Sequence, residues 1–202
     1  NTVRSLKRIL GLHANDPNLV VEEKFSTSQF ADVNGLAGAK VRFQGSQQQF
    51  NSVQLAAMYF NKIKSITAHE VKPALVNDVV ISVPAWYSDS QRRATADAAV
   101  IAGLNPVRIV NDVTAAAVGY GVFKTDLPED KPRIVAFVDI GHSDYTVSIG
   151  AFKKGELKIL ATTYDRNLGG RDVDLAIANH FAEQFLTKYK IDVRTNPKAF
   201  SR

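Results

Sequence analysis

The sequence predicts an α/β protein with mixed sheets and flanking helices. Two short β-branched runs are each followed by a helical pattern, the runs at residues 78–83 and 106–110 and the helices at 88–103 and 114–120. This β-α-β-α order predicts parallel strands covered by helices. The order then changes, because three strand-like runs follow one another at residues 133–140, 145–152 and 157–164. Those runs predict an antiparallel sheet, and short polar turns join them.

Several helix ends can be predicted from single residues. Ser88 and Gln91 have the spacing of a capping box, so a helix is expected to begin there. Gly121 is expected to end the helix of residues 114–120. A last helix is expected from Arg171, with one apolar face made of Val173, Ile177, Phe181 and Phe185.

The region before the first parallel strand predicts smaller elements. Residues 1–10 are typical of the end of a helix, closed by Gly11. Residues 26–50 alternate loosely and predict a β-meander, with turns at Asn34-Gly35, Gly38 and Gly45-Ser46. Residues 53–70 predict a helix capped by Asn51 or Ser52.

Composition narrows the function classes. The chain has 202 residues, a net charge of +5 and no cysteine, which fits a reducing compartment and a cytoplasmic protein. A membrane span would need about 18 consecutive apolar residues, and the sequence has no such run. The basic excess lies toward the C-terminal end without interleaved aromatic residues, so neither a nucleic-acid partner nor a membrane partner is expected.

The segment from Asp139 to Asp144 is the strongest candidate for a phosphate-binding loop. An apolar strand ends in Asp139, and Gly141 follows in a hairpin. Backbone N–H groups of such a turn can bind phosphate oxygens, and the carboxylate can hold a hydrated Mg²⁺. Taken alone, the same pattern is also typical of an ordinary turn.

Two other segments fit phosphate chemistry. Gly169 and Gly170 open a helix, where the backbone can approach a phosphate closely. Asp112 follows a strand and opens a helix, so it lies at the edge of a sheet where α/β sites form. The simpler interpretations are a glycine helix start and a helix cap.

Six stretches follow one another along the chain: VPAWY at 83–87, SQR at 90–92, AGLN at 102–105, RIVNDVTAAA at 108–117, DIG at 139–141 and LGGRDVD at 168–174. In this order they resemble the seventy-kilodalton heat-shock chaperones over nearly the whole chain. The resemblance implies an actin-like ATPase (ribonuclease H-like) nucleotide-binding domain that is incomplete. It also implies an ATP/ADP cofactor with Mg.

Departures from that family indicate a particular branch. Where the family has Asp-Leu-Gly-Gly-Gly-Thr-Phe-Asp, this chain has residues 139–146, DIGHSDYT, and Asn-Glu-Pro-Thr is replaced by residues 111–114, NDVT. Residues 123–128 and 131–143 resemble the large heat-shock class, the hundred-and-ten-kilodalton branch that includes the fungal Sse type.

The resemblance implies roles for individual residues. Asp139 and Asp112 are expected to be catalytic, and Asp139 to hold Mg through water. The cofactor-binding residues would be Gly141, His142, Ser143, Asp144, Tyr145, Gly169 and Gly170. Pro84 is expected to signal between domains, although it also ends a strand.

The resemblance also divides the chain. Residues 1–70 would belong to the upper subdomain of a first lobe, 71–123 to its core, 124–132 to a linker and 133–202 to the β-β-β-α start of a second lobe. The family's first phosphate loop and adenine-contacting segments have no match, so these 202 residues alone are expected to be inactive.

Three functions fit the fold to different degrees. The large class implies a nucleotide exchange factor for seventy-kilodalton chaperones that also holds unfolded polypeptide clients and hydrolyses ATP weakly. An ATP-hydrolysing seventy-kilodalton chaperone is the alternative. A sugar or acetate kinase is disfavoured by the close match through residues 83–121.

Overall fold

A computed structural model describes the chain except residues 1, 27, 73–74, 197–199 and 201–202. The chain forms two compact units, Asn1–Asn111 and Asp112–Arg202. The helix that follows the second parallel strand, grouped with that strand in the sequence-based division, packs in the second unit. Each unit is described by itself.

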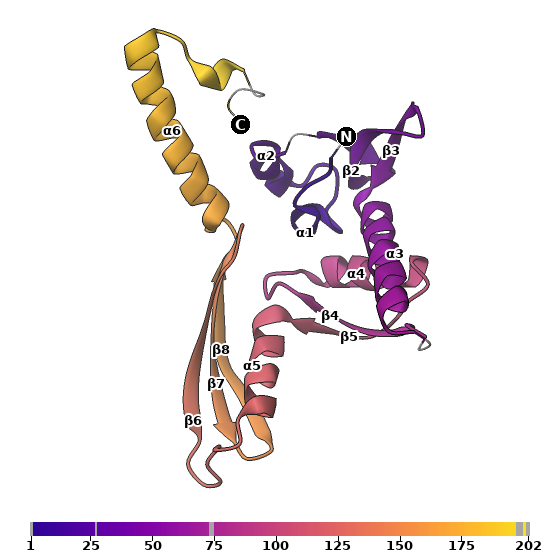
Figure 1. Cartoon of the computed structure of the whole chain (residues 1–202), viewed down its shortest axis with the longest axis vertical. Coiled ribbons are helices and arrows are strands. Elements are labelled where there is room, and N and C mark those ends of the chain that lie inside the picture. The colour runs from indigo at the N-terminus through magenta and orange to yellow at the C-terminus, as the bar shows by residue number, and fades with distance from the viewer. Residues whose placement is uncertain (1, 27, 73–74, 197–199, 201–202) are drawn as a thin grey trace. The chain divides into compact units, whose positions relative to one another are not determined.

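The first unit contains a meander, three long or medium helices and a two-stranded sheet, together with one very short helix (Figure 1). In chain order its elements are α1 (Leu6–Ile9), α2 (Pro17–Glu23), β1 (Gln29–Val33), β2 (Leu36–Phe43), β3 (Ser46–Asn51), α3 (Ser52–Glu70), β4 (Asp78–Val83), α4 (Asp89–Ile101) and β5 (Asn105–Asn111).

The predicted meander is present as three antiparallel strands in the order β1-β2-β3. Its turns lie at Asn34-Gly35 and Gln44-Gly45, where all four residues have positive φ. Gly38, predicted as a turn, instead lies inside β2 and pairs with Asn51. A Cβ at Gly38 would lie 2.3 Å from the carbonyl oxygen of Phe50, so the strands approach closely there.

Two differences from prediction lie near the N-terminus. α1 covers only Leu6–Ile9, because Ser5 has a left-handed φ of 52° that does not continue a helix. α2 was not predicted, although its start has an evident signal. Asp16 accepts a hydrogen bond from the N–H of Asn18, and Pro17 follows at the first helical position.

Helices α3 and α4 pack on each other, and each begins with a capping box. The box of Ser88 with Gln91 was predicted. At α3 the predicted cap is confirmed at Asn51, and Gln54 completes a capping box that was not predicted. Small residues allow the close approach of the helices, and the core between α1, α3 and α4 consists of Leu10, Ala56, Ala57, Ala94 and Ala98. Strands β4 and β5 pair in parallel, as the β-α-β pattern predicted.

The second unit is a three-stranded antiparallel sheet with a helix on one face. Its elements are α5 (Asp112–Phe123), β6 (Arg133–Ile140), β7 (Tyr145–Lys153), β8 (Glu156–Asp165), α6 (Gly170–Tyr189) and the 3₁₀ turn η1 (Val193–Thr195). The strands follow their predicted ranges to within one residue at each end.

Aromatic rings join α5 to the sheet. Tyr120 of α5 contacts Phe137 and Phe152, with ring centroids 5.8 Å and 5.0 Å apart. Gly121 does not end α5 as predicted, since the helix continues to Phe123. A Cβ at Gly121 would lie 3.3 Å from the Phe152 ring, so this glycine lets the helix pack closely on the sheet.

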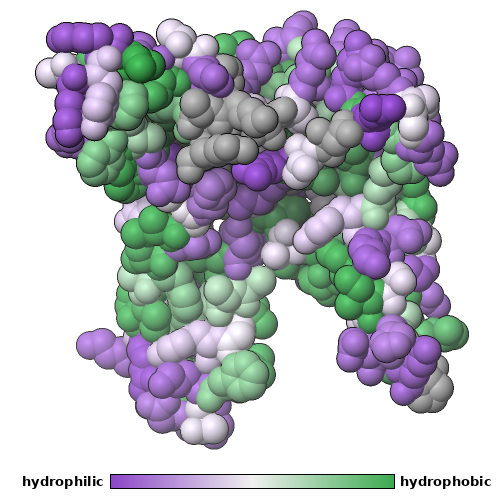
Figure 2. Space-filling view, turned by 45° about the horizontal axis from the view of Figure 1, so that its top comes forward, coloured by the Kyte–Doolittle hydropathy of each residue, from purple (hydrophilic) through white to green (hydrophobic). Residues whose placement is uncertain are grey.

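Apolar side chains are also exposed in the second unit. On the sheet face opposite α5, Ile134, Val138 and Ile140 are more than half exposed. The predicted apolar face of α6 lies largely in solvent, including Val173 and Phe181. Figure 2 shows that apolar (green) side chains are visible on the surface of the molecule. Within the described ranges, the helices lack the length and apolarity needed to cross a membrane.

Candidate functional site

The turn between β6 and β7 carries most of the predicted site residues. Ile140 and Tyr145 form the last pair of the two strands. The N–H of Gly141 donates to the carbonyl of Asp144 at 3.0 Å and closes the turn. The side chains of Asp139 and His142 are exposed, and Tyr145 is half-buried. The hairpin therefore has a fixed backbone and offers a carboxylate to solvent.

The N-terminus of α6 is joined to this hairpin through backbone hydrogen bonds. Gly170 N–H donates to the Gly141 carbonyl at 3.0 Å, and Arg171 N–H donates to the His142 carbonyl at 2.8 Å. A Cβ at Gly169 would lie 2.5 Å from the oxygen of His142, which is too close for any side chain. Gly169 is therefore needed for the contact between helix and hairpin.

These bonds use N–H groups that a helix start could otherwise present to phosphate. The N–H of Gly169 donates to the Asp172 carboxylate at 2.9 Å, and Gly170 and Arg171 donate to the hairpin. The structure thus brings Gly169 and Gly170 next to Gly141–Ser143, as a support for the hairpin.

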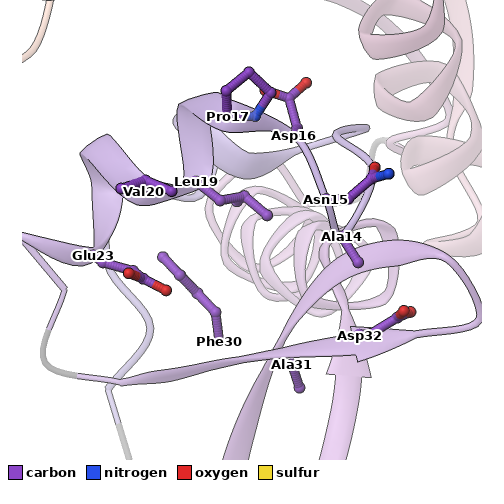
Figure 3. A pocket seen from close by; sticks show the side chains of 10 residues that line it. All are labelled: Ala14, Asn15, Asp16, Pro17, Leu19, Val20, Glu23, Phe30, Ala31 and Asp32. Carbon is purple, nitrogen blue, oxygen red and sulfur yellow. The ribbon is translucent and has the colours of Figure 1, made fainter.

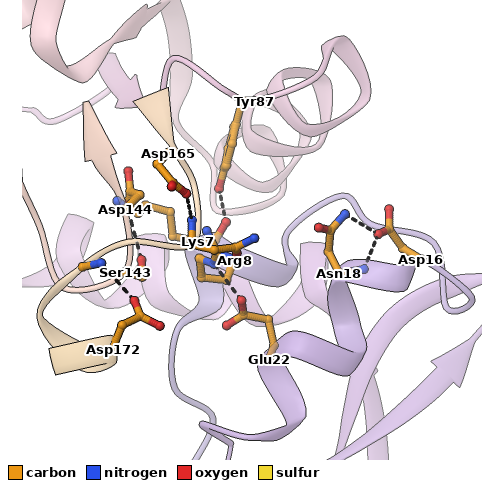
Figure 4. Close-up of polar contacts among 12 residues, drawn as sticks. Lys7, Arg8, Asp16, Asn18, Glu22, Tyr87, Ser143, Asp144, Asp165 and Asp172 are labelled. Atoms are coloured by element: carbon orange, nitrogen blue, oxygen red, sulfur yellow. Dashed lines mark hydrogen bonds and ion pairs between the residues drawn. The ribbon is translucent and has the colours of Figure 1, made fainter. Parts of the chain in front are cut away.

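Ser143 and Asp144 form a buried polar pair in the turn. Their exposed fractions are 4% and 6%, and the Ser143 hydroxyl donates to Oδ1 of Asp144 at 3.1 Å (Figure 4). A carboxylate that accepts a hydrogen bond is cheaper to bury than one without a partner. The Asp144 carboxylate is consequently part of the framework of the turn.

Asp139 and Asp112 belong to the same side of the second unit. Residues 137 and 139 lie on one face of β6 because side chains alternate along a strand, and Phe137 contacts α5. Tyr120, near the other end of α5, contacts Phe152, which pairs with Arg133 at the far end of the sheet. The end of α5 that carries Asp112 is thus directed toward the hairpin (Figure 1).

The donor set around Asp139 fits a hydrated metal ion better than an all-protein cage. Among the described residues, no group of three or more His, Cys, Asp or Glu side chains could hold a metal. Mg²⁺ in nucleotide sites keeps several waters and uses one or two carboxylates together with phosphate oxygens. The exposed Asp139 carboxylate at a strand end meets that requirement.

Pro84, in the first unit, ends β4 and is buried. Its carbonyl accepts hydrogen bonds from the N–H of Tyr87 at 3.1 Å and from Nη2 of Arg92 at 3.4 Å. Arg92 also donates to the Tyr87 carbonyl and, at 2.7 Å, to Oδ1 of Asn111. Arg92 thus joins the turn after β4 to the end of β5.

Sequence reasoning did not assign Arg92 a role. Its signals were its place in the matching stretch of residues 90–92 and its position in the first turn of a capped helix. Pro84 and Tyr87 lie in the preceding turn, but Asn111 lies at the end of β5, and a local pattern does not report that tertiary contact.

A hollow of about 260 Å³ lies between α2 and β1, away from the predicted phosphate loop in sequence (Figure 3). Its lining contains Leu19, Val20 and Phe30 and three carboxylates, Asp16, Glu23 and Asp32. The charges that line it in the described part of the chain are all negative. This hollow would repel phosphate and is not a nucleotide site.

Comparison with known proteins identifies the family. The family model described as Hsp70 protein matches residues 1–202, the whole chain. The chain therefore belongs to the Hsp70 family, and the actin-like nucleotide-binding fold predicted from the motifs is confirmed. Nucleotide binding is the cofactor class that this membership implies.

Individual relatives identify the branch. The chain is 62% identical to a heat shock protein homolog of the Sse type from Lachancea kluyveri and 58% identical to one from Saccharomyces cerevisiae, over 100% of this chain and 29% of each relative. It is 44% identical to Heat shock 70 kDa protein 4 of Canis lupus familiaris, over 24% of that protein. These relatives confirm the assignment to the large heat-shock class. The chain spans less than a third of their length.

Proposed function

We propose that the chain is the ATP-binding part of a large heat-shock co-chaperone that accelerates nucleotide exchange on seventy-kilodalton chaperones. The same protein would hold unfolded polypeptides during folding, in the cytoplasm. The observation that carries the proposal is the hairpin of residues 139–145. It keeps the exposed Asp139 and the Gly141 turn, while residues 142–144 depart from the pattern of the seventy-kilodalton chaperones.

The residue roles are taken from the resemblance, and the geometry supports them. Asp139 would hold Mg²⁺ through water, because its carboxylate is exposed at the end of β6. The backbone of residues 141–145 would lie against the phosphates of ATP or ADP. Gly169 and Gly170 would act indirectly, by fixing the hairpin, since their N–H groups already donate within the protein.

The changed hairpin residues support binding with slow hydrolysis. His142 and Ser143 stand where the family has glycines, so the backbone has less freedom to follow the reacting phosphate. Ser143 also fixes the carboxylate of Asp144 at 3.1 Å. Asp112 has a shorter side chain than the family's Glu, and its Oδ1 accepts from Val113 N–H at 2.8 Å. Positioning of a catalytic carboxylate is sensitive to such differences.

Pro84 would report the nucleotide state to the rest of the protein. Its turn is held by side-chain contacts from Arg92, and a side chain can exchange partners without unfolding the strand. The turn would then serve as the two-state element that a conformational signal requires.

The test measures release of labelled ADP from a seventy-kilodalton chaperone with the full-length protein added. We expect faster release when the full-length protein carries ATP than when it is nucleotide-free. If ADP release is no faster than without the protein, the exchange-factor function is wrong.

An ATP-hydrolysing chaperone is the second candidate, favoured by the presence of carboxylates at both Asp139 and Asp112. The two functions differ in turnover. Steady-state hydrolysis by the full-length protein should be well below that of the seventy-kilodalton partner. Hydrolysis at the partner's own rate would favour the second candidate.

A further inference from the structure

Two adjacent aromatic residues connect the Pro84 turn to the N-terminal helix. The hydroxyl of Tyr87 donates to the carbonyl of Lys7 at 2.6 Å, across 80 residues of sequence. The guanidinium of Arg8 lies over the Trp86 ring, 5.1 Å from its centroid. Trp86 and Tyr87 are 7% and 6% exposed and contact each other edge to face. The turn and α1 are therefore packed as one piece.

Arg8 extends this connection to α2. Its Nε donates to Oε1 of Glu22 at 2.7 Å, and the two side chains are 1% and 2% exposed (Figure 4). If the two side chains moved apart while buried, each charge would lose the contact that compensates the cost of its burial. α1 and α2 have 4 and 7 residues, too few to be stable helices by themselves. Their positions depend on contacts such as this one.

We propose that Arg8 is a positioning residue that couples the Pro84 turn to α2. A planar guanidinium can stack on an indole and donate to a carboxylate at the same time, which an ammonium group cannot do in the same geometry. Displacement of Trp86 therefore displaces Arg8, and Glu22 follows because the buried pair stays together. α2 carries Leu19, Val20 and Glu23 at the hollow beside β1, so the shape of that hollow depends on the turn.

The use of this coupling as a nucleotide signal rests on the proposed function of Pro84. The coupling itself does not, because the contacts that define it, among Arg8, Glu22 and Trp86, lie within the first unit. It can be tested without nucleotide or partner, so failure of the exchange-factor function and failure of this inference give different results.

The first experiment changes α2 and observes Trp86. The Trp86 signal is the fluorescence of the full-length protein minus that of its Trp86→Leu variant, which removes the contribution of any other tryptophan. Glu22→Gln should shift the Trp86 signal, and Glu23→Gln, which changes an exposed carboxylate on the same helix, should not. In an Arg8→Lys background the shift caused by Glu22→Gln should be largely lost.

The second experiment changes the turn and observes α2, and it does not depend on folding of the Glu22 variant. Hydrogen exchange of the α2 amides should become severalfold faster in Trp86→Leu, while exchange in β3 stays as in the wild type. Unchanged α2 exchange, or a Glu22→Gln shift of the same size in the Arg8→Lys background, would show that Arg8 has only a local structural role and overturn the proposal.

Discussion

The turns that follow β4 and β6 are each closed by a backbone hydrogen bond, to the carbonyls of Pro84 and Asp144 respectively, but different kinds of contact join them to neighbouring elements. Side-chain contacts join the Pro84 turn to its neighbours, through Arg92, Tyr87 and Trp86. Backbone N–H groups of Gly170 and Arg171 join the Gly141 turn to α6. Side-chain contacts can be exchanged by rotation about χ angles, whereas backbone hydrogen bonds can be exchanged only if the backbone itself moves. We infer a movable turn in the first unit and a rigid one in the second.

Removing the buried charge beside the first turn should have the largest effect. Arg8→Met leaves the Glu22 carboxylate buried without the guanidinium, and loss of one partner of a buried pair costs about 3–5 kcal/mol. Urea denaturation of the full-length protein measures the loss. Arg93→Met is the matched control, since its pair with Asp89 is exposed, at 78% and 76%, and should change stability by less than about 1 kcal/mol. Equal losses in the two variants would contradict the buried-pair argument.

A methyl group at Gly169 should have the next largest effect. In Gly169→Ala the new Cβ would meet the His142 carbonyl at 2.5 Å, so α6 or the hairpin must shift. Overpacking of this kind costs about 1–3 kcal/mol, and ATP affinity should fall with it. Urea denaturation and calorimetry measure the two effects.

Gly170→Ala is the control for that change. Its Cβ would lie 3.8 Å from the nearest atom, the Gly141 oxygen, an ordinary contact. Alanine also favours a helix over glycine by about 1 kcal/mol. We therefore expect unchanged or slightly higher stability, and a loss similar to that of Gly169→Ala would refute the docking role of Gly169.

Arg92→Met should separate signalling from binding. The variant loses the hydrogen bonds to Pro84, Tyr87 and Asn111, with a stability cost of about 1–3 kcal/mol. ATP should bind with nearly unchanged affinity, because the partners of Arg92 are Pro84, Tyr87 and Asn111 and none belongs to the hairpin proposed to bind nucleotide. The difference in partner affinity between ATP-bound and nucleotide-free protein should shrink. If that difference is retained in full, Arg92 has no part in the signal.

The smallest effect concerns the exposed pair of Asp126 and Arg133, at the end of the β6-β7-β8 sheet that lies far from the hairpin of residues 139–145. A hydrogen bond from Arg133, at 3.1 Å, lowers the pKa of Asp126. A carboxyl with a lowered folded-state pKa contributes stability above its unfolded pKa, about 3.9, and loses it as pH falls through the folded value. Asp126→Asn should therefore lower the urea midpoint slightly at pH 7 and not at pH 2. A difference that persists at pH 2 would mean that the charge is not responsible.

The sequence predicted regular elements well because their signals are local. The three strands of the second unit and the caps at Asn51 and Ser88 follow from alternation and capping residues within a few positions. Glycines were less informative. Gly38 and Gly121 were assigned to a turn and a helix end, but both are required by close contacts with other elements, which a local pattern cannot distinguish from a turn.

The site was predictable in part. The hairpin and the glycine pair were each predicted from a short motif. The strand end and turn of the hairpin are adjacent in sequence, and so are the glycine pair and the start of α6. The hydrogen bonds that use the Gly169–Arg171 N–H groups could not be predicted, because they depend on where α6 lies. The same holds for Arg8, whose partners Glu22 and Trp86 lie 14 and 78 residues away, and for Arg92, whose partner Asn111 lies 19 residues away.

The most direct test of the nucleotide site is calorimetric titration of the full-length protein with Mg·ATP, for the wild type and for Asp139→Asn. Because the Asp139 carboxylate is exposed, the variant should fold with an unchanged melting temperature. Loss of the charge proposed to face a hydrated Mg²⁺ should weaken Mg·ATP binding by about tenfold or more, equivalent to about 1.4 kcal/mol. Equal affinities in the two proteins would contradict the assignment of the hairpin as the nucleotide site.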